Sequence, residues 1–184
     1  NLPAARRSGT LEQLGLQPRK FAFVTLHRPS NVDRRESLAA IMEELMALAQ
    51  RMPVVFPIHP RTRKMLAEFG ISLEKSPQLK VLEPLGYHAS LSLSENAAVV
   101  LTDSGGLQEE TTYFRTRCLT LRPNTERPIT VTEGSNLLTT LATLRRDLDE
   151  AVNAKQPKGS VPDRWDGKTA GRILDELARG VGAP

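Results

Sequence analysis

Alternation of strand-like and helix-like segments along the chain is the feature that most constrains its fold. Short runs rich in Val, Leu, Ile and Phe, typical of buried strands, occur at 21–26, 53–58, 79–82, 98–101, 118–121 and 136–139. Segments with helical periodicity lie between and after them, at 38–48, 62–69, 87–96, 106–114, 141–154 and 166–177. Such alternation predicts parallel strands joined by helical crossovers on both faces of one sheet. We therefore predict an α/β fold with a doubly wound, Rossmann-like parallel sheet.

The helix expected at 38–48 shows the periodicity most clearly. Its apolar side chains recur at spacings of three and four residues, which places them on one face of a helix. They are Leu38, Ile41, Met42, Leu45 and Leu48. The helix expected at 166–177 carries a similar stripe of Ala170, Ile173, Leu174 and Leu177.

One domain preceded by a linker is the organisation that we expect. Residues 1–20 are polar and interrupted by prolines, a composition more typical of a linker than of the start of a domain. Residues 21–184 carry all of the predicted strands. With 184 residues and 39% hydrophobic content, the chain is long enough to bury a core in one such unit.

The distribution of charge argues against a nucleic-acid partner. The 25 Lys and Arg residues are interspersed with 21 Asp and Glu residues, and no basic arm stands out. Aromatic residues make up only 4% of the chain, too few for platforms on which bases stack. The mild net charge of +4 fits a small phosphate-bearing ligand at least as well.

Cysteine content and hydropathy indicate a soluble chain in the cytoplasm. Cys118 is the one cysteine and stands in an apolar run, so we expect a buried thiol, no internal disulfide and a reducing compartment. No apolar stretch approaches the ~20 residues needed to span a bilayer, and the N-terminus lacks the apolar segment of a signal peptide. His and Cys are too few and too dispersed for a zinc site, and we expect neither a metal nor a cofactor.

The segment after the fourth predicted strand is the strongest candidate for a binding site. Ser104, Gly105 and Gly106 stand where a buried strand turns into a helix. Free backbone N–H groups and the positive end of the helix dipole favour an anion there, and glycines let a phosphate approach the backbone. Glu110, one turn further, is able to accept hydrogen bonds from sugar hydroxyls. In the alternative interpretation Ser104 is only a helix cap, the glycines form a packing turn and Glu110 lies on a solvated face.

Polar residues follow three other predicted strands. His27 and Arg28 follow the first and are able to bind phosphate oxygens, Arg28 through two parallel hydrogen bonds. His59 follows the second strand, and Arg127 follows the fifth. Each also has a plain structural interpretation: a capping loop, a histidine at a strand end, and an arginine paired with Glu126. Because the carboxyl ends of parallel strands share one edge of a sheet, we expect these loops to lie together.

Several familiar motifs are absent. No Gly-x-Gly-x-x-Gly follows the first strand and no Walker lysine loop occurs, which disfavours NAD and P-loop ATP chemistry. The Gly-x-Ser-x-Gly motif of serine hydrolases is also missing.

Six segments in order do resemble a known family. They are Thr-Leu-His-Arg-Pro-Ser-Asn-Val-Asp (25–33), Pro-Ile-His-Pro-Arg-Thr (57–62), Leu-Gly-Tyr (85–87), Leu-Thr-Asp-Ser-Gly-Gly-Leu-Gln-Glu-Glu (101–110), Asn-Thr-Glu-Arg-Pro (124–128) and Trp-Asp-Gly-Lys (165–168). Together they resemble the C-terminal half of the non-hydrolysing UDP-N-acetylglucosamine 2-epimerases, over roughly residues 20–180. The resemblance implies one lobe of a GT-B-like fold, in which two Rossmann-like lobes enclose the active site.

The resemblance also implies roles for individual residues. Ser104, Gly105 and Gly106 match the loop that holds the UDP phosphates, and Glu110 matches the glutamate that binds the ribose. His27 and Arg127 match a histidine and an arginine that face the diphosphate and the reacting sugar. There they would help to stabilise UDP as it departs.

The family converts UDP-GlcNAc to UDP-ManNAc by eliminating UDP and adding it back after inversion at C2, which requires proton removal and return. The acid and base carboxylates of the family belong to the N-terminal lobe, and this chain resembles only the lobe that follows the interlobe linker. We therefore expect the 184 residues alone to be inactive, and the full-length enzyme to be a homodimer that supplies precursors of cell-surface polysaccharides.

Some positions depart from the family pattern. Leu85 and Ser90 stand where well-known bacterial members carry a glutamine and a phenylalanine near the uracil. His59 falls near a histidine of the regulatory second-substrate site of some members, but in a different context, so we do not predict that regulation. Two alternatives remain open on the residues: a lobe of a GT-B glycosyltransferase, and a non-catalytic nucleotide-binding module.

Overall fold

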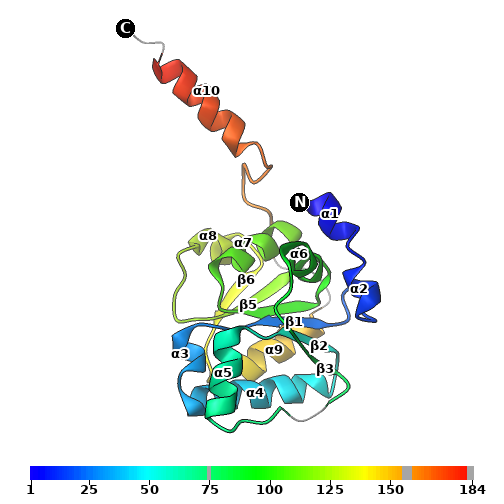
Figure 1. The fold of residues 1–184 in the computed structure, drawn as a ribbon. Coiled ribbons are helices and arrows are strands. Elements are labelled where there is room, and N and C mark those ends of the chain that lie inside the picture. The colour runs from blue at the N-terminus through cyan, green and yellow to red at the C-terminus, as the bar shows by residue number, and fades with distance from the viewer. Residues whose placement is uncertain (74–75, 155–158, 182–184) are drawn as a thin grey trace.

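A single sheet of six parallel strands forms the centre of the molecule (Figure 1) in the part of the chain that the computed structural model describes, residues 1–73, 76–154 and 159–181. The strands are β1 (Ala22–Thr25), β2 (Val54–Pro57), β3 (Leu79–Leu82), β4 (Val99–Thr102), β5 (Arg117–Leu121) and β6 (Asn136–Thr139). Their order is β3-β2-β1-β4-β5-β6, and every neighbouring pair is parallel. The chain therefore reverses its direction across the sheet between β1 and β4, the place where ligands bind in open sheets of this kind.

Helices cover both faces of the sheet, as the alternation predicts. In Figure 1, α4 (Arg35–Ala49), α5 (Pro60–Glu68) and α9 (Leu144–Asn153) lie below the strands, while α6 (Tyr87–Asn96), α7 (Gly105–Phe114) and α8 (Pro128–Thr132) lie above. Buried strand residues alternate between two hydrophobic clusters. Val99 and Leu101 of β4 join the lower cluster, and Val100 joins the upper one. A strand that is buried on both faces reads as a continuous apolar run, which is the pattern seen in the sequence.

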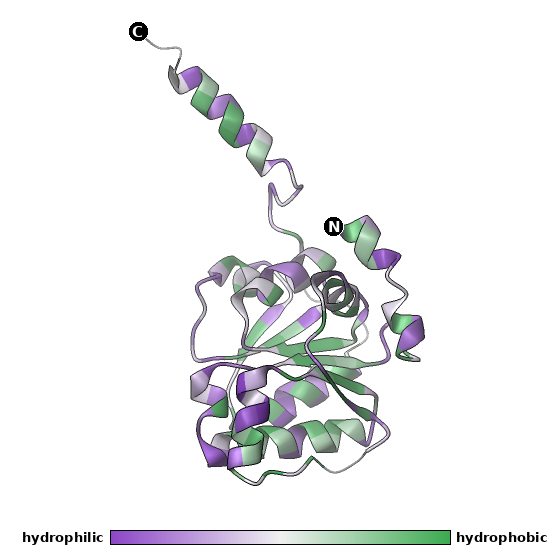
Figure 2. Cartoon of the chain, in the orientation of Figure 1, coloured by the Kyte–Doolittle hydropathy of each residue, from purple (hydrophilic) through white to green (hydrophobic). Residues whose placement is uncertain are grey.

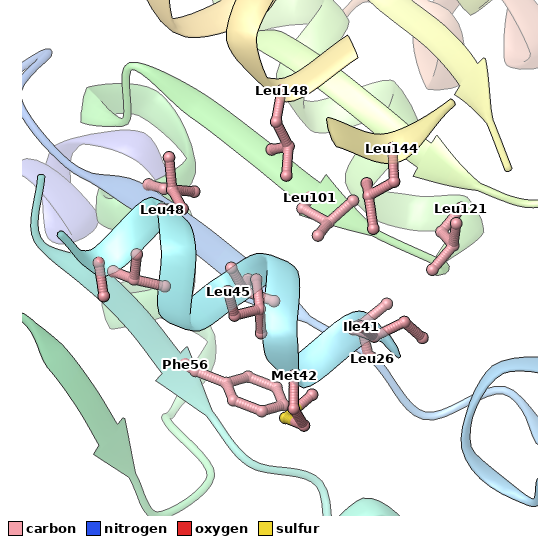
Figure 3. Packing of buried hydrophobic residues seen from close by; sticks show 14 of the residues in the cluster. Leu26, Ile41, Met42, Leu45, Leu48, Phe56, Leu101, Leu121, Leu144 and Leu148 are labelled. Carbon is pink, nitrogen blue, oxygen red and sulfur yellow. The ribbon is translucent and has the colours of Figure 1, made fainter. Parts of the chain in front are cut away.

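The lower face contains the larger cluster (Figure 3). The stripe predicted for α4 is buried there, and its leucines, Ile41 and Met42 pack with Leu26, Phe56, Leu101, Leu144 and Leu148. Removing one such side chain from water stabilises the fold by roughly 1.5–3 kcal/mol. This cluster packs α4 and α9 against the lower face of the sheet.

Residues 1–20 contain two short helices, α1 (Leu2–Arg6) and α2 (Thr10–Gln13). The Arg6 guanidinium donates to the Glu95 carboxylate, and Arg19 donates to the carbonyl of Ala97 and the hydroxyl of Thr116. The segment that we expected to be a linker is therefore attached to α6 and its neighbours. The domain boundary at residue 20 stays a prediction, and its far end at 182–184 lies outside the described residues.

Two further short helices were not predicted, α3 (Pro29–Val32) and α8. Each begins at a proline, whose fixed φ suits the first turn of a helix. Their four and five residues are too few for an apolar period to appear in the sequence. The predicted buried thiol is confirmed: Cys118 is buried, and burial raises its pKa to about 11.

The last helix, α10 (Thr169–Val181), stands away from the sheet in Figure 1. Its predicted apolar stripe is exposed, with Ile173, Leu174 and Leu177 at 54%, 66% and 59% of full exposure. Figure 2 shows green and purple residues alternating along this helix. None of the described helices is long and apolar enough to cross a bilayer.

Candidate functional site

Asp103 joins the loop after β1 to the loop after β4. Its fully buried carboxylate accepts hydrogen bonds from the backbone N–H groups of His27 and Arg28, at 3.0 and 2.8 Å, and from Asn31 Nδ2 at 3.0 Å. The His27 ring approaches the same carboxylate, with Nδ1 3.0 Å from Oδ1. Such a set of donors compensates for the loss of water around a buried charge. The two loops therefore lie together at one edge of the sheet, as the strand order predicts.

Ser104, Gly105 and Gly106 form the start of α7. Ser104 is the residue before the first turn, but its hydroxyl makes no capping hydrogen bond. A Cβ on Gly105 or Gly106 would meet no atom of the described chain within 4 Å, and neither glycine has a positive φ. Packing and backbone conformation therefore do not require glycine here, which argues against the interpretation as a packing turn. Both glycines belong to the first turn of α7, and the first N–H groups of an α-helix have no partner within the helix, which suits an anion.

Arg127 lies beside this helix start. Its Nε is 2.9 Å from Oε1 of Glu109, and Nη1 donates to the Glu126 carbonyl. Glu109 is four residues beyond Gly105 and lies on the same side of α7. The alternative in which Arg127 pairs with the Glu126 carboxylate is wrong, because that carboxylate pairs with Arg122.

The Arg122–Glu126 pair is a part of the site that the sequence did not reveal. The largely buried Arg122 guanidinium donates to both oxygens of Glu126, at 2.8 and 2.6 Å. These hydrogen bonds lower the pKa of Glu126 to about 2, so it stays charged near neutral pH. Arg28 also contributes to the field at Glu126, while its Nε donates to the Asp103 carbonyl at 3.0 Å. The positive charge of Arg122 is thereby compensated by the Glu126 carboxylate of the same loop.

Gln108 is a second residue that sequence reasoning missed. Its side chain is fully buried and connects three segments. Nε2 donates to the Ser104 carbonyl at 3.2 Å, and Oε1 accepts from the Thr125 hydroxyl at 2.5 Å and from Asn136 Nδ2 at 3.2 Å. The Thr125 hydroxyl also accepts from the Arg127 backbone N–H at 2.9 Å. The start of α7 and the Arg127 loop are thus linked through one buried amide.

Glu110 lies on the neighbouring side of α7, half-buried rather than fully solvated. Burial raises its pKa, and a hydrogen bond from Tyr87 partly opposes this effect. Both side chains line a cavity of about 500 Å³ between α1, α6 and α7, whose wall also includes Leu91, Tyr113 and Trp165. A cavity of this size suits a small organic ligand.

His59 lies next to His27. The two ring centroids are 5.2 Å apart and the ring planes are inclined by 36°. His59 is the N-cap of α5, and its Nδ1 accepts a hydrogen bond from the Arg61 backbone N–H at 3.1 Å. The loops after β1, β2, β4 and β5 therefore all contribute to one edge, and among the described residues no three His, Cys, Asp or Glu side chains are grouped as a metal ion requires.

A family model and the sequences of known proteins both match this chain to the same family. Residues 2–178 match the family described as UDP-N-acetylglucosamine 2-epimerase. The UDP-N-acetylglucosamine 2-epimerase of Methanocaldococcus jannaschii is 38% identical over 170 residues, which are 87% of this chain and 45% of the relative. The enzyme of the same name from Methanococcus maripaludis is 44% identical over 123 residues, 65% of this chain and 34% of the relative.

A solved structure agrees. The crystal structure of the M. jannaschii UDP-GlcNAc 2-epimerase in complex with UDP-GlcNAc and UDP superposes with a TM-score of 0.81 and 35% identity, over 97% of this chain and 51% of that one. This chain thus spans about half the length of the M. jannaschii enzyme. The matched residues cover nearly the whole chain, and it belongs to the UDP-N-acetylglucosamine 2-epimerase family.

Proposed function

We propose that this chain is the UDP-binding lobe of a UDP-GlcNAc 2-epimerase. The single observation that supports this most is the N-terminus of α7, where a Cβ on Gly105 or Gly106 would have open space around it and Arg127 pairs with Glu109 of the same helix. A diphosphate fits this arrangement because it combines backbone N–H donors with a guanidinium. Family membership favours this function over a glycosyltransferase lobe or a non-catalytic binding module.

In this proposal the ligand extends along α7. The diphosphate binds at Ser104, Gly105 and Gly106, with Arg28 contributing a further positive charge. One turn along, Glu110 accepts hydrogen bonds from the ribose hydroxyls, next to the cavity lined by Tyr87. A carboxylate at this place suits the two adjacent hydroxyl groups of a ribose.

His27 and Arg127 would act on the bond that breaks. Elimination places negative charge on the departing UDP, and cationic or N–H donors aimed at that charge lower the barrier. Arg127 is held near α7 by Glu109, and His27 is held by Asp103. Both are thus arranged for stabilising charge at the diphosphate.

Proton exchange at C2 needs groups on both faces of the sugar. The acidic side chains around the site already have partners in the chain: Asp103 with four N–H groups, Glu109 with Arg127, Glu126 with Arg122, and Glu110 with Tyr87. We infer that the acid and base come from the other half of the full-length enzyme. Homodimer formation, a role in polysaccharide-precursor synthesis and the cytoplasmic location stay predictions.

Two measurements on the 184-residue chain test this proposal. NMR titration should give millimolar binding of UDP, about −4 kcal/mol, with weaker binding of UMP and weaker still of uridine. Equal binding of uridine and UDP would contradict a phosphate site. The chain should also fail to exchange the C2 proton of UDP-GlcNAc in deuterated water, and measurable exchange would show that the catalytic groups are misassigned.

A further inference from the structure

The two nitrogens of the His27 ring have different surroundings. Nδ1 is 3.0 Å from Oδ1 of Asp103, and that carboxylate is fully buried. An ionised carboxylate only accepts hydrogen bonds, so the proton of a neutral His27 ring lies on Nδ1. Nε2 is then the nitrogen with the lone pair, on the side of the ring away from Asp103, and the His27 side chain is 40% exposed.

Donors other than the His27 ring hold the Asp103 carboxylate in place. Oδ2 accepts from the backbone N–H groups of His27 and Arg28 and from Asn31 Nδ2, within 2.8 to 3.0 Å. Asn31 Nδ2 also donates to the Leu121 carbonyl, which ties the carboxylate to the end of β5. Oδ1 is left for the His27 ring and for a longer contact of 3.2 Å from the His27 backbone N–H.

We propose that Asp103 is a positioning residue, which holds His27 in the Nδ1–H tautomer and presents Nε2 to the ligand. The part of this proposal that concerns the departing diphosphate rests on the proposed function, whereas the tautomer does not. A cationic His27 ring donates Nε2–H to a phosphate oxygen, and a neutral ring in this tautomer accepts a proton at Nε2. In the other tautomer the neutral ring has its lone pair toward Asp103 and cannot accept a proton on the ligand side.

The neighbouring His59 provides an internal comparison. Its Nδ1 accepts from the Arg61 backbone N–H, so a neutral His59 carries its proton on Nε2. Two adjacent histidines are thus expected to have opposite tautomers, each determined by a different local partner. A spectrum that resolves the signals of the two rings therefore reports both tautomers in one measurement.

Nitrogen-15 NMR of the imidazole rings tests the tautomer directly. The chain has three histidines, and His59→Gln and His88→Gln identify their signals. At a pH where the rings are neutral, the lone-pair nitrogen of His27 should be Nε2 and that of His59 should be Nδ1. If His27 shows its lone pair on Nδ1 in the unmodified chain, the proposal is wrong, and this result needs no substitution at Asp103.

Asp103→Asn is the decisive variant. The amide oxygen is expected at the Oδ2 position, where three N–H groups converge, so the amide nitrogen faces His27 Nδ1. Two donors cannot share that contact, and the His27 proton should move to Nε2. Asn31→Ala is the matched control, because it removes a donor from the same carboxylate and leaves Oδ1 for the ring. Its His27 tautomer should remain Nδ1–H, and an equal change in both variants would indicate a purely structural role.

Adding UDP separates this proposal from the proposed function. A UDP-dependent shift of His27 Nε2 in the unmodified chain, reduced at least several-fold in Asp103→Asn, supports both. An unshifted His27 with the Nδ1–H tautomer would reject the role of His27 at the diphosphate and leave the positioning by Asp103 in place.

Discussion

Arg127 Nε lies 2.9 Å from the Glu109 carboxylate, and Glu109 stands one helical turn beyond Gly105. The guanidinium is therefore held beside the start of α7 by an acidic side chain. A phosphate that binds at this helix start must share Arg127 with Glu109 or replace it. The strength of this one exposed ion pair thus bears on the affinity for any anion at the site.

Glu109→Gln should bind UDP more tightly than the unmodified chain. An exposed ion pair of this kind is worth about 0.2–1 kcal/mol, so its loss should tighten UDP by roughly 1.4- to 5-fold. Arg127→Ala should weaken UDP by about 1.5–3 kcal/mol through a lost charged hydrogen bond. Isothermal titration with UDP and uridine measures both effects, with Arg145→Ala, in a pair with Glu44, as the control. Weaker UDP binding by Glu109→Gln would mean that the Glu109 carboxylate favours phosphate binding, by holding Arg127 in place, and does not compete with the phosphate for Arg127.

Gly105→Ala separates folding from binding. A methyl group there meets no atom of the described chain, and alanine favours a helix over glycine. The free energy of unfolding should therefore stay equal or rise by up to about 1 kcal/mol, while UDP affinity falls because the methyl group stands in the path of the phosphate. Urea unfolding measures the stability of the variant, and UDP titration of the same sample measures its affinity. Unchanged UDP affinity would place the phosphate elsewhere.

Glu110→Gln should weaken UDP by roughly 1–2 kcal/mol and weaken deoxyuridine diphosphate distinctly less, since one hydroxyl partner is already missing. Burial raises the pKa of Glu110. As pH falls, this carboxylate therefore takes up a proton at a higher pH than an ordinary glutamate does, and it then no longer accepts both hydrogen bonds. Uridine affinity should fall with decreasing pH in the unmodified chain and stay flat in Glu110→Gln. Uridine is the suitable probe because it has no titrating phosphate. If both nucleotides lose the same affinity, Glu110 does not bind the ribose, and the alternative interpretation of a solvent-facing glutamate is favoured.

The Arg122–Glu126 pair predicts a pH dependence of stability. The pKa of Glu126 is lowered from 4.5 to about 2 in the folded chain, so the pair stabilises the fold above the higher value. This stability is lost as pH falls through the window between these values, because the unfolded chain takes up the proton first. Glu126→Gln should therefore lose less stability than the unmodified chain between pH 4.5 and 2, as measured by urea unfolding. Parallel curves for the two proteins would show that the pair does not contribute.

Much of the fold follows from local patterns in the sequence. The stripe from Leu38 to Leu48 has the helical period, and the strands are apolar because both of their faces are buried. Parallel strands place their carboxyl ends at one edge of the sheet, and this brings the loops of His27 and Ser104 together. These features were predictable because each depends on the period of neighbouring residues.

The links within the site were not predictable in the same way. Gln108 is one polar residue in a helix, and its importance comes from Thr125 and Asn136, which contact it only after the chain has folded. In the sequence Asp103 is only the residue before Ser104, whereas in the structure its carboxylate accepts hydrogen bonds from the backbone of a distant loop. Contacts between segments 75 residues apart leave no periodic signal in either segment.

The exposed stripe of α10 has a consequence for local stability. A helix of 13 residues whose apolar stripe is left exposed by the described part of the chain lies near the balance between helix and coil in water. Its amides should exchange with deuterium by local fraying, whereas those of β4, paired on both sides, should exchange only when the whole domain opens. The chain thus combines the extremes of backbone protection: β4 reports on global unfolding, and α10 reports on whether Ile173, Leu174 and Leu177 are covered.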